Sequence, residues 1–450
     1  MMIIKLARHI TKRCLTLTML TLILPTAGIA QVLDNQVQPV LQDVQRTTDR
    51  VRNQVQERVQ ENLQERAPET MHKFNQAVVT LTNDTMTWLP VLGENNQELF
   101  AEVTLEDGTR VLEREWLVVA SNETEEVLRD MGAQMLAKQK LGAVGITVLR
   151  FKVPTEYNDE ALLRRQLPKA AAASLVRHYV YDTQSMAASA NTVQATQRRW
   201  CDAPLSIGMI DTAVDTAHPA FTNQTIVQKD FLTHGVAQPT AHGTAIAGLL
   251  IGSHDDYESL VPQAKLYSAA IFHRHNALQQ GAALLPLLEA LNWLAEQQVR
   301  VINMSLTGPG NTLLQQAVKR LSEQNILLIA AAGNDGPAAP ANYPAAYEEV
   351  IAVTAVDTHG VIYRWANQGE FVEFAARGVQ VKTARRDGQV GYETGTSMAA
   401  PVVAAAAACI WHDYPQQNAT EVRKALQQRV IDLGENGRDS VFGFGLLTAQ

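Results

Sequence analysis

Residues 395–401 read Gly-Thr-Ser-Met-Ala-Ala-Pro and lead into a run of alanine and valine at 402–408. Proline is tolerated in the first turn of a helix, so we expect a helix that begins just after Ser397, with Ser397 as its N-cap. The apolar run predicts close packing of this helix inside a core. Its positive end would then face the serine hydroxyl and any oxyanion formed beside it. Capping alone also explains the pattern, so the rest of the chain must distinguish a cap from a nucleophile.

A nucleophilic serine needs a base to take its proton and a carboxylate to orient that base. Residues 205–210 are predicted to form a buried strand that delivers Asp211 at the carboxyl edge of a parallel sheet, where open sheets hold their sites. His242 stands at the start of a small apolar helix predicted at 241–250. The helix dipole disfavours a charged imidazolium there, which suits a proton acceptor. Taken singly, Asp211 is typical of a turn and His242 of an ordinary core or surface histidine.

An amide side chain stands at the end of another predicted strand. The apolar residues 326–332 are followed by Gly-Asn-Asp-Gly at 333–336. Acyl transfer needs hydrogen-bond donors aimed at the developing oxyanion, and Asn334 is a candidate for one of them. The same four residues are also a common turn signature. A single catalytic site explains Asn334 together with Asp211, His242 and Ser397. Purely structural roles would need a separate explanation for each of the four residues.

These motifs resemble those of the subtilisin-like serine peptidases, the subtilases. The resemblance extends from about Leu205 to the end of the chain, and its Asp, His, Ser order differs from the orders of chymotrypsin and the α/β-hydrolases. The motifs are Asp-Thr-Ala-Val-Asp at 211–215, His-Gly-Thr at 242–244, Asn-Met-Ser-Leu at 303–306, Ala-Gly-Asn-Asp-Gly at 332–336 and the run at 395–401.

The resemblance implies a role for each catalytic candidate. Asp211 orients His242, which acts first as general base and then as general acid, while Ser397 attacks the scissile carbonyl and forms an acyl-enzyme. Asn334 and the backbone N–H of Ser397 hold the oxyanion. Substrates would lie extended along a strand edge. The residues implied to line the substrate site are Ser305, Leu306, Thr307, Gly308, Ala331, Ala332 and Gly333.

Two departures from the family pattern limit what can be carried over. Thr307 stands where a glycine is usual, which adds a branched side chain beside the substrate. The resemblance therefore does not predict the width of the pocket. Residues 252–263 lack the Asn/Gly loop that binds calcium in many relatives. We therefore predict no metal and no cofactor, and leave a structural calcium ion open.

Composition and charge bound the class of protein. The chain has 450 residues, 46% of them hydrophobic, which is enough for two or three compact units. Its net charge of −8 and the lack of a basic stripe argue against a nucleic-acid partner. No segment after residue 30 is apolar enough to span a bilayer. Residues 1–30 predict a signal peptide cut before Gln31, hence a secreted or periplasmic protein, because an apolar run at 15–24 follows Lys5, Arg8, Lys12 and Arg13.

Signal cleavage would leave two cysteines, Cys201 and Cys409. An oxidising compartment favours a disulfide between them, since Cys201 precedes the first core strand and Cys409 lies deep in the serine helix. Two buried free thiols are the alternative, and the sequence leaves both open.

The region before the motifs divides by pattern. Residues 31–84 predict an amphipathic helix with a coiled-coil-like stripe, which either lies against its own prodomain or binds a partner. Residues 85–182 resemble the small α/β propeptide of secreted subtilases, which templates folding and blocks the cleft until it is removed. Residues 183–204 form a polar linker with a hypothetical maturation cut within 184–199. The elements predicted for the propeptide-like region are a hairpin around 107–108, helices at 123–137 and 159–167, and strands at 146–153 and 175–181.

From residue 205 to 450 strand and helix patterns alternate, which predicts an α/β fold with a subtilisin-like parallel sheet covered by helices on both faces. The predicted helices lie at 284–297 and 313–323, and the strands near Ile207, Leu266, Val301, Ile326 and Val350.

We predict a serine endopeptidase whose partners are extended protein or peptide substrates and its own propeptide. One alternative is a catalytically silent subtilisin-like fold that acts as a binding protein through the helix of 31–84. Another is a metal site, although no zinc-ligand spacing such as His-Glu-x-x-His occurs. The residues that prompt it are His234, His242, His254, Asp255, Asp256, His273 and His275.

Overall fold

The structure is a computed structural model that describes residues 88–93, 97–183, 186–188, 198–255, 257–274 and 280–449, without the side chains of 186–188. The predicted signal peptide, the amphipathic helix of 31–84 and half of the linker lie outside the described residues, as do Asp256 and His275. Residues 86–450 form one compact unit.

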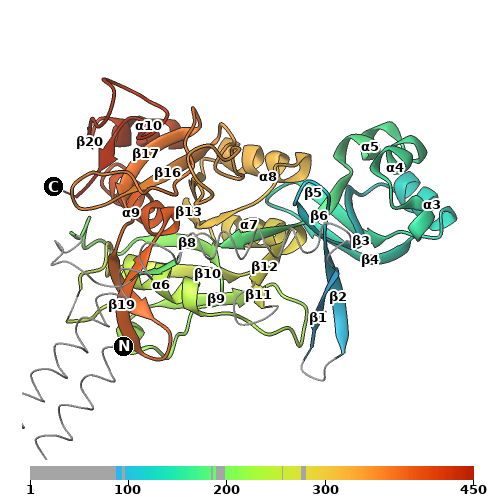
Figure 1. Ribbon diagram of the computed structural model, residues 1–450, viewed down its shortest axis with the longest axis horizontal. Helices are drawn as coiled ribbons and strands as arrows, with labels where there is room; N and C mark the ends of the chain where they lie inside the picture. Colours follow the sequence, from blue (N-terminus) through green and yellow to red (C-terminus); the bar gives the residue numbers. More distant parts are fainter. Residues whose placement is uncertain are drawn as a thin grey trace, which may run out of the picture. The chain divides into compact units, whose positions relative to one another are not determined.

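A nine-stranded, mainly parallel sheet forms the centre of the C-terminal region (Figure 1). Its order is β20-β21-β17-β16-β15-β13-β8-β10-β9, and only β20 and β21 pair antiparallel. All five predicted strands are present. The strands are β8 (Ser206–Asp211), β9 (Ile226–Asp230), β10 (Lys265–Ala270), β13 (Val301–Met304), β15 (Leu327–Ala331), β16 (Val350–Val356), β17 (Val372–Arg377), β20 (Val430–Ile431) and β21 (Leu446–Leu447).

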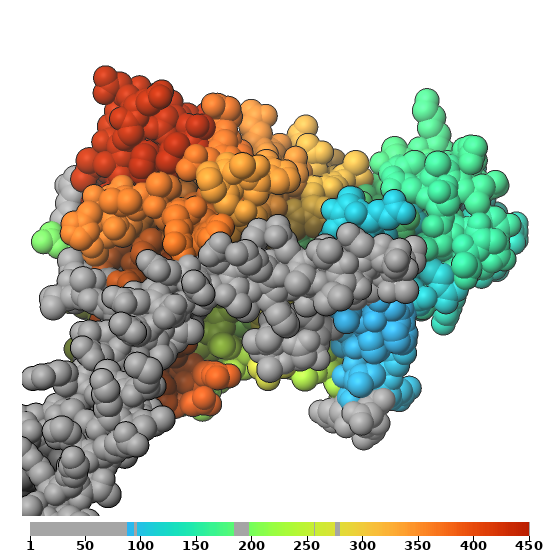
Figure 2. Space-filling view, in the orientation of Figure 1, coloured from blue at the N-terminus to red at the C-terminus, as the bar shows by residue number. Residues whose placement is uncertain are grey.

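Helices cover both faces of this sheet, as predicted. Ile329 and Ala330 are neighbours in β15 but belong to different apolar clusters, because successive side chains of a strand point to opposite faces. One cluster contains α6 (Ala241–Ile251), α9 (Thr396–Asp413) and α10 (Ala419–Gln427), and the other contains α7 (Leu284–Glu296) and α8 (Thr312–Glu323). The C-terminal strands β20 and β21 extend one edge of the sheet. The C-terminal residues, in red, form the upper left part of the surface in Figure 2.

Residues 88–183 form a smaller α/β region on an antiparallel sheet. Its strand β6 also pairs with β12 (Gln280–Ala283) and with β14 (Leu306–Thr307), so this sheet continues into the C-terminal region. Small pairings complete the fold, among them β11 (His273–Arg274) with β12, and β18 (Val381–Arg385) with β19 (Gln389–Thr394). The elements of the smaller region are β1 (Trp88–Leu92), β2 (Glu98–Thr104), β3 (Arg110–Val119), α3 (Asn122–Asp130), β4 (Gln134–Leu141), β5 (Ile146–Lys152), α4 (Glu160–Gln166), α5 (Lys169–Ser174) and β6 (Val176–Thr183).

The helix predicted at 123–137 is too long. It ends at Asp130, and Gly132 follows with a φ of +75°, a left-handed conformation that commonly ends helices. The next residues form β4, which pairs antiparallel with β5. Pairing with a distant strand therefore overrides the local helical pattern. The hairpin at 107–108 and the remaining predicted elements are present, with ends shifted by one or two residues.

The start of α9 also differs from the prediction. Gly395 is the N-cap, with a φ of +150° that favours glycine, and Ser397 is the second residue of the helix. Pro401 lies inside the helix, not in its first turn. Proline has no N–H to donate to the carbonyl four residues earlier, which belongs to Ser397. The Oγ of Ser305 donates to that carbonyl at 3.0 Å instead, so a distant side chain replaces the missing helical bond.

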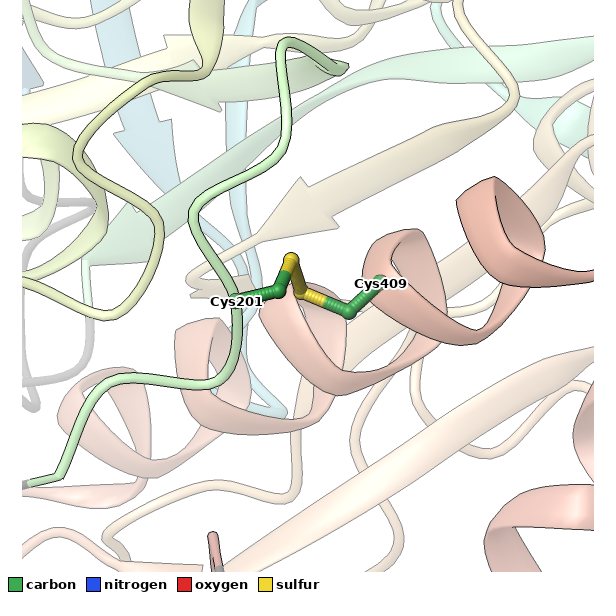
Figure 3. Close-up of a disulfide and its surroundings, with 2 residues drawn as sticks. All are labelled: Cys201 and Cys409. Carbon is green, nitrogen blue, oxygen red and sulfur yellow. A yellow bond between two sulfur atoms is a disulfide. The ribbon is translucent and has the colours of Figure 1, made fainter.

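Cys201 and Cys409 form a disulfide that joins the segment before β8 to the C-terminal half of α9 (Figure 3). Their Cα atoms lie 6.0 Å apart and 208 residues separate them in sequence. In the chain-entropy model, closing so long a loop stabilises the fold by about 5 kcal/mol. The bridge thus ties the helix that carries Ser397 to the segment that leads into the strand of Asp211.

His178 of β6 bridges the smaller region to α7. Its Nδ1 lies 2.8 Å from Oε2 of Glu115, and its Nε2 accepts a hydrogen bond from the backbone N–H of Leu285 at 3.2 Å. No side chain of the N-cap residue caps α7, so His178 satisfies an N–H of its first turn. Arg150 binds the same Glu115 through two hydrogen bonds of 2.7 and 2.9 Å. The pairing requires a neutral imidazole with its proton on Nδ1.

This contact predicts a loss of stability in acid. Burial, the largest influence, lowers the pKa of His178, Glu115 opposes that effect, and the charges of Arg150 and His273 reinforce it. The unfolded chain therefore binds more protons, so the free energy of unfolding falls as pH falls below about 6.5, the ordinary histidine pKa. We expect a loss of roughly 1–3 kcal/mol, because protonation leaves a buried N–H unpaired.

Urea unfolding of the full chain between pH 5 and 7.5 measures this effect, in a Ser397→Ala background that prevents self-digestion. His178→Phe should flatten the pH dependence, whereas substitution of His359, whose side chain is 83% exposed, should leave it unchanged. An unchanged slope in His178→Phe would contradict the prediction.

Candidate active site

Asp211 and His242 are joined directly. Asp211 is the last residue of β8, and His242 lies in the first turn of α6. Nδ1 of His242 lies 2.6 Å from Oδ1 of Asp211, and both residues are buried. Because the carboxylate accepts the Nδ1 proton, the neutral ring carries its lone pair on Nε2. His242 thus has the tautomer that a general base requires.

A glycine makes this approach possible. A Cβ atom on Gly243 would lie 2.3 Å from the carbonyl oxygen of Thr212, so only glycine allows the start of α6 to lie this close to the end of β8. The backbone N–H of Gly243 donates to Oγ1 of Thr212 at 2.7 Å. The backbone N–H of Thr212 in turn donates to Oδ1 of Asp211 at 2.7 Å. The close contact of helix and strand therefore fixes both His242 and Asp211.

Ser397 is held by the segment that follows β13. Its Oγ donates to the carbonyl oxygen of Ser305 at 3.3 Å, and its own carbonyl accepts from Oγ of Ser305. Nδ2 of Asn303 donates to Oγ of Ser305 at 3.0 Å. No hydrogen bond joins Ser397 to His242 in the described part of the chain, although α6 and α9 pack against each other. Catalytic hydrogen bonds are often long before substrate binds and shorten in the complex.

The amide of Asn334 has a fixed orientation. Oδ1 accepts hydrogen bonds from the backbone N–H of Thr396 at 3.1 Å and from its hydroxyl at 3.0 Å. The hydroxyl of Thr396 accepts in turn from the backbone N–H of Gly333 at 3.2 Å. These bonds identify Oδ1 as the acceptor end, so Nδ2 is the donor end of the amide. Asn334 is thereby anchored to the residue that precedes Ser397.

The residues predicted to bind substrate come together beside this site. Ser305 is buried, Leu306 and Thr307 form β14, and Gly308 pairs with Tyr343. Ala331, Ala332 and Gly333 lie at the end of β15, which packs against β14. The chain's own β6 lies on β14 as an antiparallel strand, with Thr183 opposite Leu306 and Asp182 opposite Thr307.

Some residues of the site were given no role from the sequence. Thr212 and Thr396 lie within the quoted motifs, and the structure shows that they position the candidate residues through side-chain hydrogen bonds. Glu393 of β19 is a further buried carboxylate near the site. Burial raises its pKa, while Arg385, 2.9 Å away, and His242 oppose that rise. Only the folded chain brings Glu393 near His242.

The described histidines that were considered for a metal site do not converge. His242 contacts Asp211, and Nε2 of His273 lies 2.7 Å from Glu102. Within the described ranges, no group of three or more His, Cys, Asp or Glu side chains is arranged to hold a metal ion. Nor does any helix in those ranges have the length and apolar character needed to cross a membrane.

The fold defines a class of α/β proteins with a mainly parallel sheet, and comparison with known proteins names the family. Residues 203–445, just over half of the chain, match the Subtilase family, to which the chain belongs. It is 32% identical to subtilisin DY of Bacillus licheniformis over 257 residues, which cover 55% of this chain and 90% of that protein. It is 33% identical to the minor extracellular protease Epr of Bacillus subtilis (strain 168) over 220 residues, or 48% of this chain.

A solved structure supports the same fold. Fervidolysin from Fervidobacterium pennivorans, a keratinolytic enzyme related to subtilisin, superposes with a TM-score of 0.65 at 19% identity. The match covers 81% of this chain, which is more than residues 203–445 alone, and 63% of that chain. The fold is therefore subtilisin-like. The chain spans about a third of the length of Epr and under two thirds of fervidolysin.

Proposed function

We propose that the chain is a serine endopeptidase that cleaves protein or peptide substrates through an acyl-enzyme. The observation that carries this proposal is the buried hydrogen bond of 2.6 Å between His242 and Asp211, beside the helix start that bears Ser397. Membership of the Subtilase family supports the same reaction.

In this proposal the proton of Ser397 moves to Nε2 of His242 as Oγ attacks the substrate carbonyl. Asp211 holds the imidazole in the required tautomer and stabilises the imidazolium. The oxyanion accepts hydrogen bonds from Nδ2 of Asn334 and the backbone N–H of Ser397, at the positive end of α9. His242 then protonates the leaving amine, and water attacks the acyl-enzyme by the reverse sequence of proton transfers.

Covalent labelling tests the identity of the nucleophile. A fluorophosphonate should modify the active protein at one site, and mass spectrometry of its peptides should locate the label on Ser397. Casein hydrolysis should be lost in proportion to the fraction of protein that is labelled. A chelator should leave the hydrolysis intact. Activity that resists the label but is lost with the chelator would contradict the proposal and favour metal chemistry. A folded protein that neither hydrolyses casein nor reacts would favour the silent binding protein.

We propose further that residues 85–182 are a propeptide that inhibits the enzyme until it is removed. The pairing of β6 with β14 supports this, because β6 lies where an extended substrate would pair. The pairing of β7 (Met186–Ala188) also supports the propeptide proposal. Met186, which follows β6 in the chain, pairs with Thr394, three residues before Ser397.

These two pairings predict where maturation occurs. Thr183 and Met186 both pair with segments that adjoin Ser397, so we expect the cut at one of the peptide bonds between them. N-terminal sequencing of the mature enzyme should give a start at Gln184, Ser185 or Met186, and Ser397→Ala should remain uncut. Replacing Arg198 and Arg199 with glutamine should not change the start. A start after Arg199, or fully active protein that begins at Gln31, would contradict this prediction.

Export from the cytoplasm is part of the same proposal. The disulfide supports an oxidising compartment, and the name of one relative describes it as extracellular. The signal sequence predicted at 1–30 is consistent with that destination.

A further inference from the structure

Tyr181 belongs to the smaller N-terminal region but packs within the C-terminal one. Its side chain is fully buried and lies in the apolar cluster that contains residues of β14 and α8. The ring lies against Gly308, where an added Cβ atom would come within 2.3 Å of Cδ1 of Tyr181. Gly308 and Tyr343 exchange two backbone hydrogen bonds of 2.8 and 3.0 Å, which fix this wall. We call this site the tyrosine slot.

The tyrosine slot has polar partners for a phenol hydroxyl at its far end. Nδ2 of Asn311 donates to Oη of Tyr181 at 2.8 Å, and Oη donates to the carbonyl oxygen of Pro309 at 3.0 Å. Both hydrogen-bonding roles of the hydroxyl are therefore filled by the C-terminal region.

Asn311 cannot turn its amide around. Its Oδ1 caps α8 by accepting from the backbone N–H of Leu314 at 2.9 Å, which leaves Nδ2 as the end that faces Tyr181. The backbone of Asn311 is also held, because Oη of Tyr347 accepts from its N–H at 2.9 Å and donates to its carbonyl at 3.0 Å. The donor in the tyrosine slot is thus preorganised.

Tyr181 reaches the slot through a pairing that a substrate can copy. It lies two residues before Thr183, which pairs with Leu306, so its side chain points to the same side of the strand as that of Thr183. A substrate that pairs with β14 in the same register places one of its own side chains in the slot. We propose that the enzyme selects substrates with tyrosine at that position and recognises the hydroxyl through Asn311 and Pro309. The inference rests on the proposed function.

Phenylalanine fills the same volume but leaves both polar partners unpaired in a buried site. Sites built to bind a hydroxyl discriminate strongly against analogues that lack it, since an unpaired buried donor is unfavourable. We expect kcat/KM to be at least about tenfold higher for tyrosine than for phenylalanine.

Two peptides based on residues 177–188 test the preference. They carry Tyr or Phe at the position of Tyr181, and both carry Ala at the position of Tyr179 to prevent a shifted register. The protein is the mature enzyme obtained from the full chain. Asn311→Ser keeps a capping oxygen for α8 but loses the donor, so it should reduce the Tyr/Phe ratio of kcat/KM to near 1. Asn418→Ser, the same change at the N-cap of α10, should preserve the ratio. Equal rates for both peptides in the unmodified enzyme would overturn the inference while leaving the proposed function in place.

A binding measurement keeps the test independent of catalysis. In full-chain Ser397→Ala carrying Tyr181→Ala, the emptied slot should bind p-cresol, and Asn311→Ser should raise the Kd for p-cresol about tenfold relative to the Kd for toluene. The same change in both Kd values would overturn the inference. If no peptide is cleaved but p-cresol binding depends on Asn311, the proposed function fails and the hydroxyl recognition stands.

Discussion

Ser397→Ala should lower kcat for peptide hydrolysis roughly 10⁶-fold, the loss known for the corresponding change in subtilisin. The hydroxyl is the only group on the residue that can attack a carbonyl. The fold should tolerate the change, because the Oγ atom makes one hydrogen bond as a donor, of 3.3 Å, to the carbonyl of Ser305. The loss of kcat is measured with a quenched fluorescent peptide as substrate. The enzyme concentration must be high enough to detect residual turnover.

A matched serine separates loss of the nucleophile from loss of structure. Ser268 is buried in β10, opposite Met209 of β8, and its hydroxyl bonds none of the catalytic candidates, so Ser268→Ala should leave kcat and KM unchanged. Equal activity in Ser397→Ala and the unmodified enzyme would eliminate the serine mechanism. A residual activity well above that of Asp211→Ala combined with His242→Ala would also argue against Ser397 as the attacking group, since residues that act as one unit lose activity together.

Asn334→Ala should lower kcat about 10²–10³-fold with little change in KM, the effect known for the oxyanion asparagine of subtilisin. The donor acts on charge that develops in the transition state, so its removal affects turnover more than substrate binding. The side chain also accepts two hydrogen bonds from Thr396, which gives Asn334 a structural role beside the catalytic one.

Asn334→Asp distinguishes these roles. The carboxylate keeps an acceptor for the N–H and hydroxyl of Thr396 but places a negative oxygen where Nδ2 stood. We therefore expect kcat of the Asp variant to fall at least as far as that of the Ala variant, while its thermal stability stays closer to that of the unmodified enzyme. Activity retained in Asn334→Asp would show that Asn334 acts only by holding Thr396.

Sequence patterns predicted the parts of the fold that depend on neighbouring residues. The apolar runs near Ile207, Leu266 and Val350 each form a central strand, because a strand buried on both faces needs apolar residues throughout. The catalytic candidates were found because each lies at the end of such a strand or the start of a buried helix. By contrast, residues 134–137 form a strand instead of a helix because of their pairing with β5, which no local pattern reveals.

The sequence by itself determined the alternation of strands and helices from residue 205 onward, the family motifs and the candidate residues Asp211, His242, Asn334 and Ser397. Only the tertiary structure decided how these groups are held. The Oγ of Ser305 replaces a helical bond that Pro401 cannot make, across 92 residues of sequence, and Thr396 fixes the direction of the Asn334 amide across 62. The tyrosine slot joins Tyr181 to Asn311 across 130 residues. Hydrogen bonds and close packing depend on distances in space, and chain separations of this size leave no periodic pattern in the sequence.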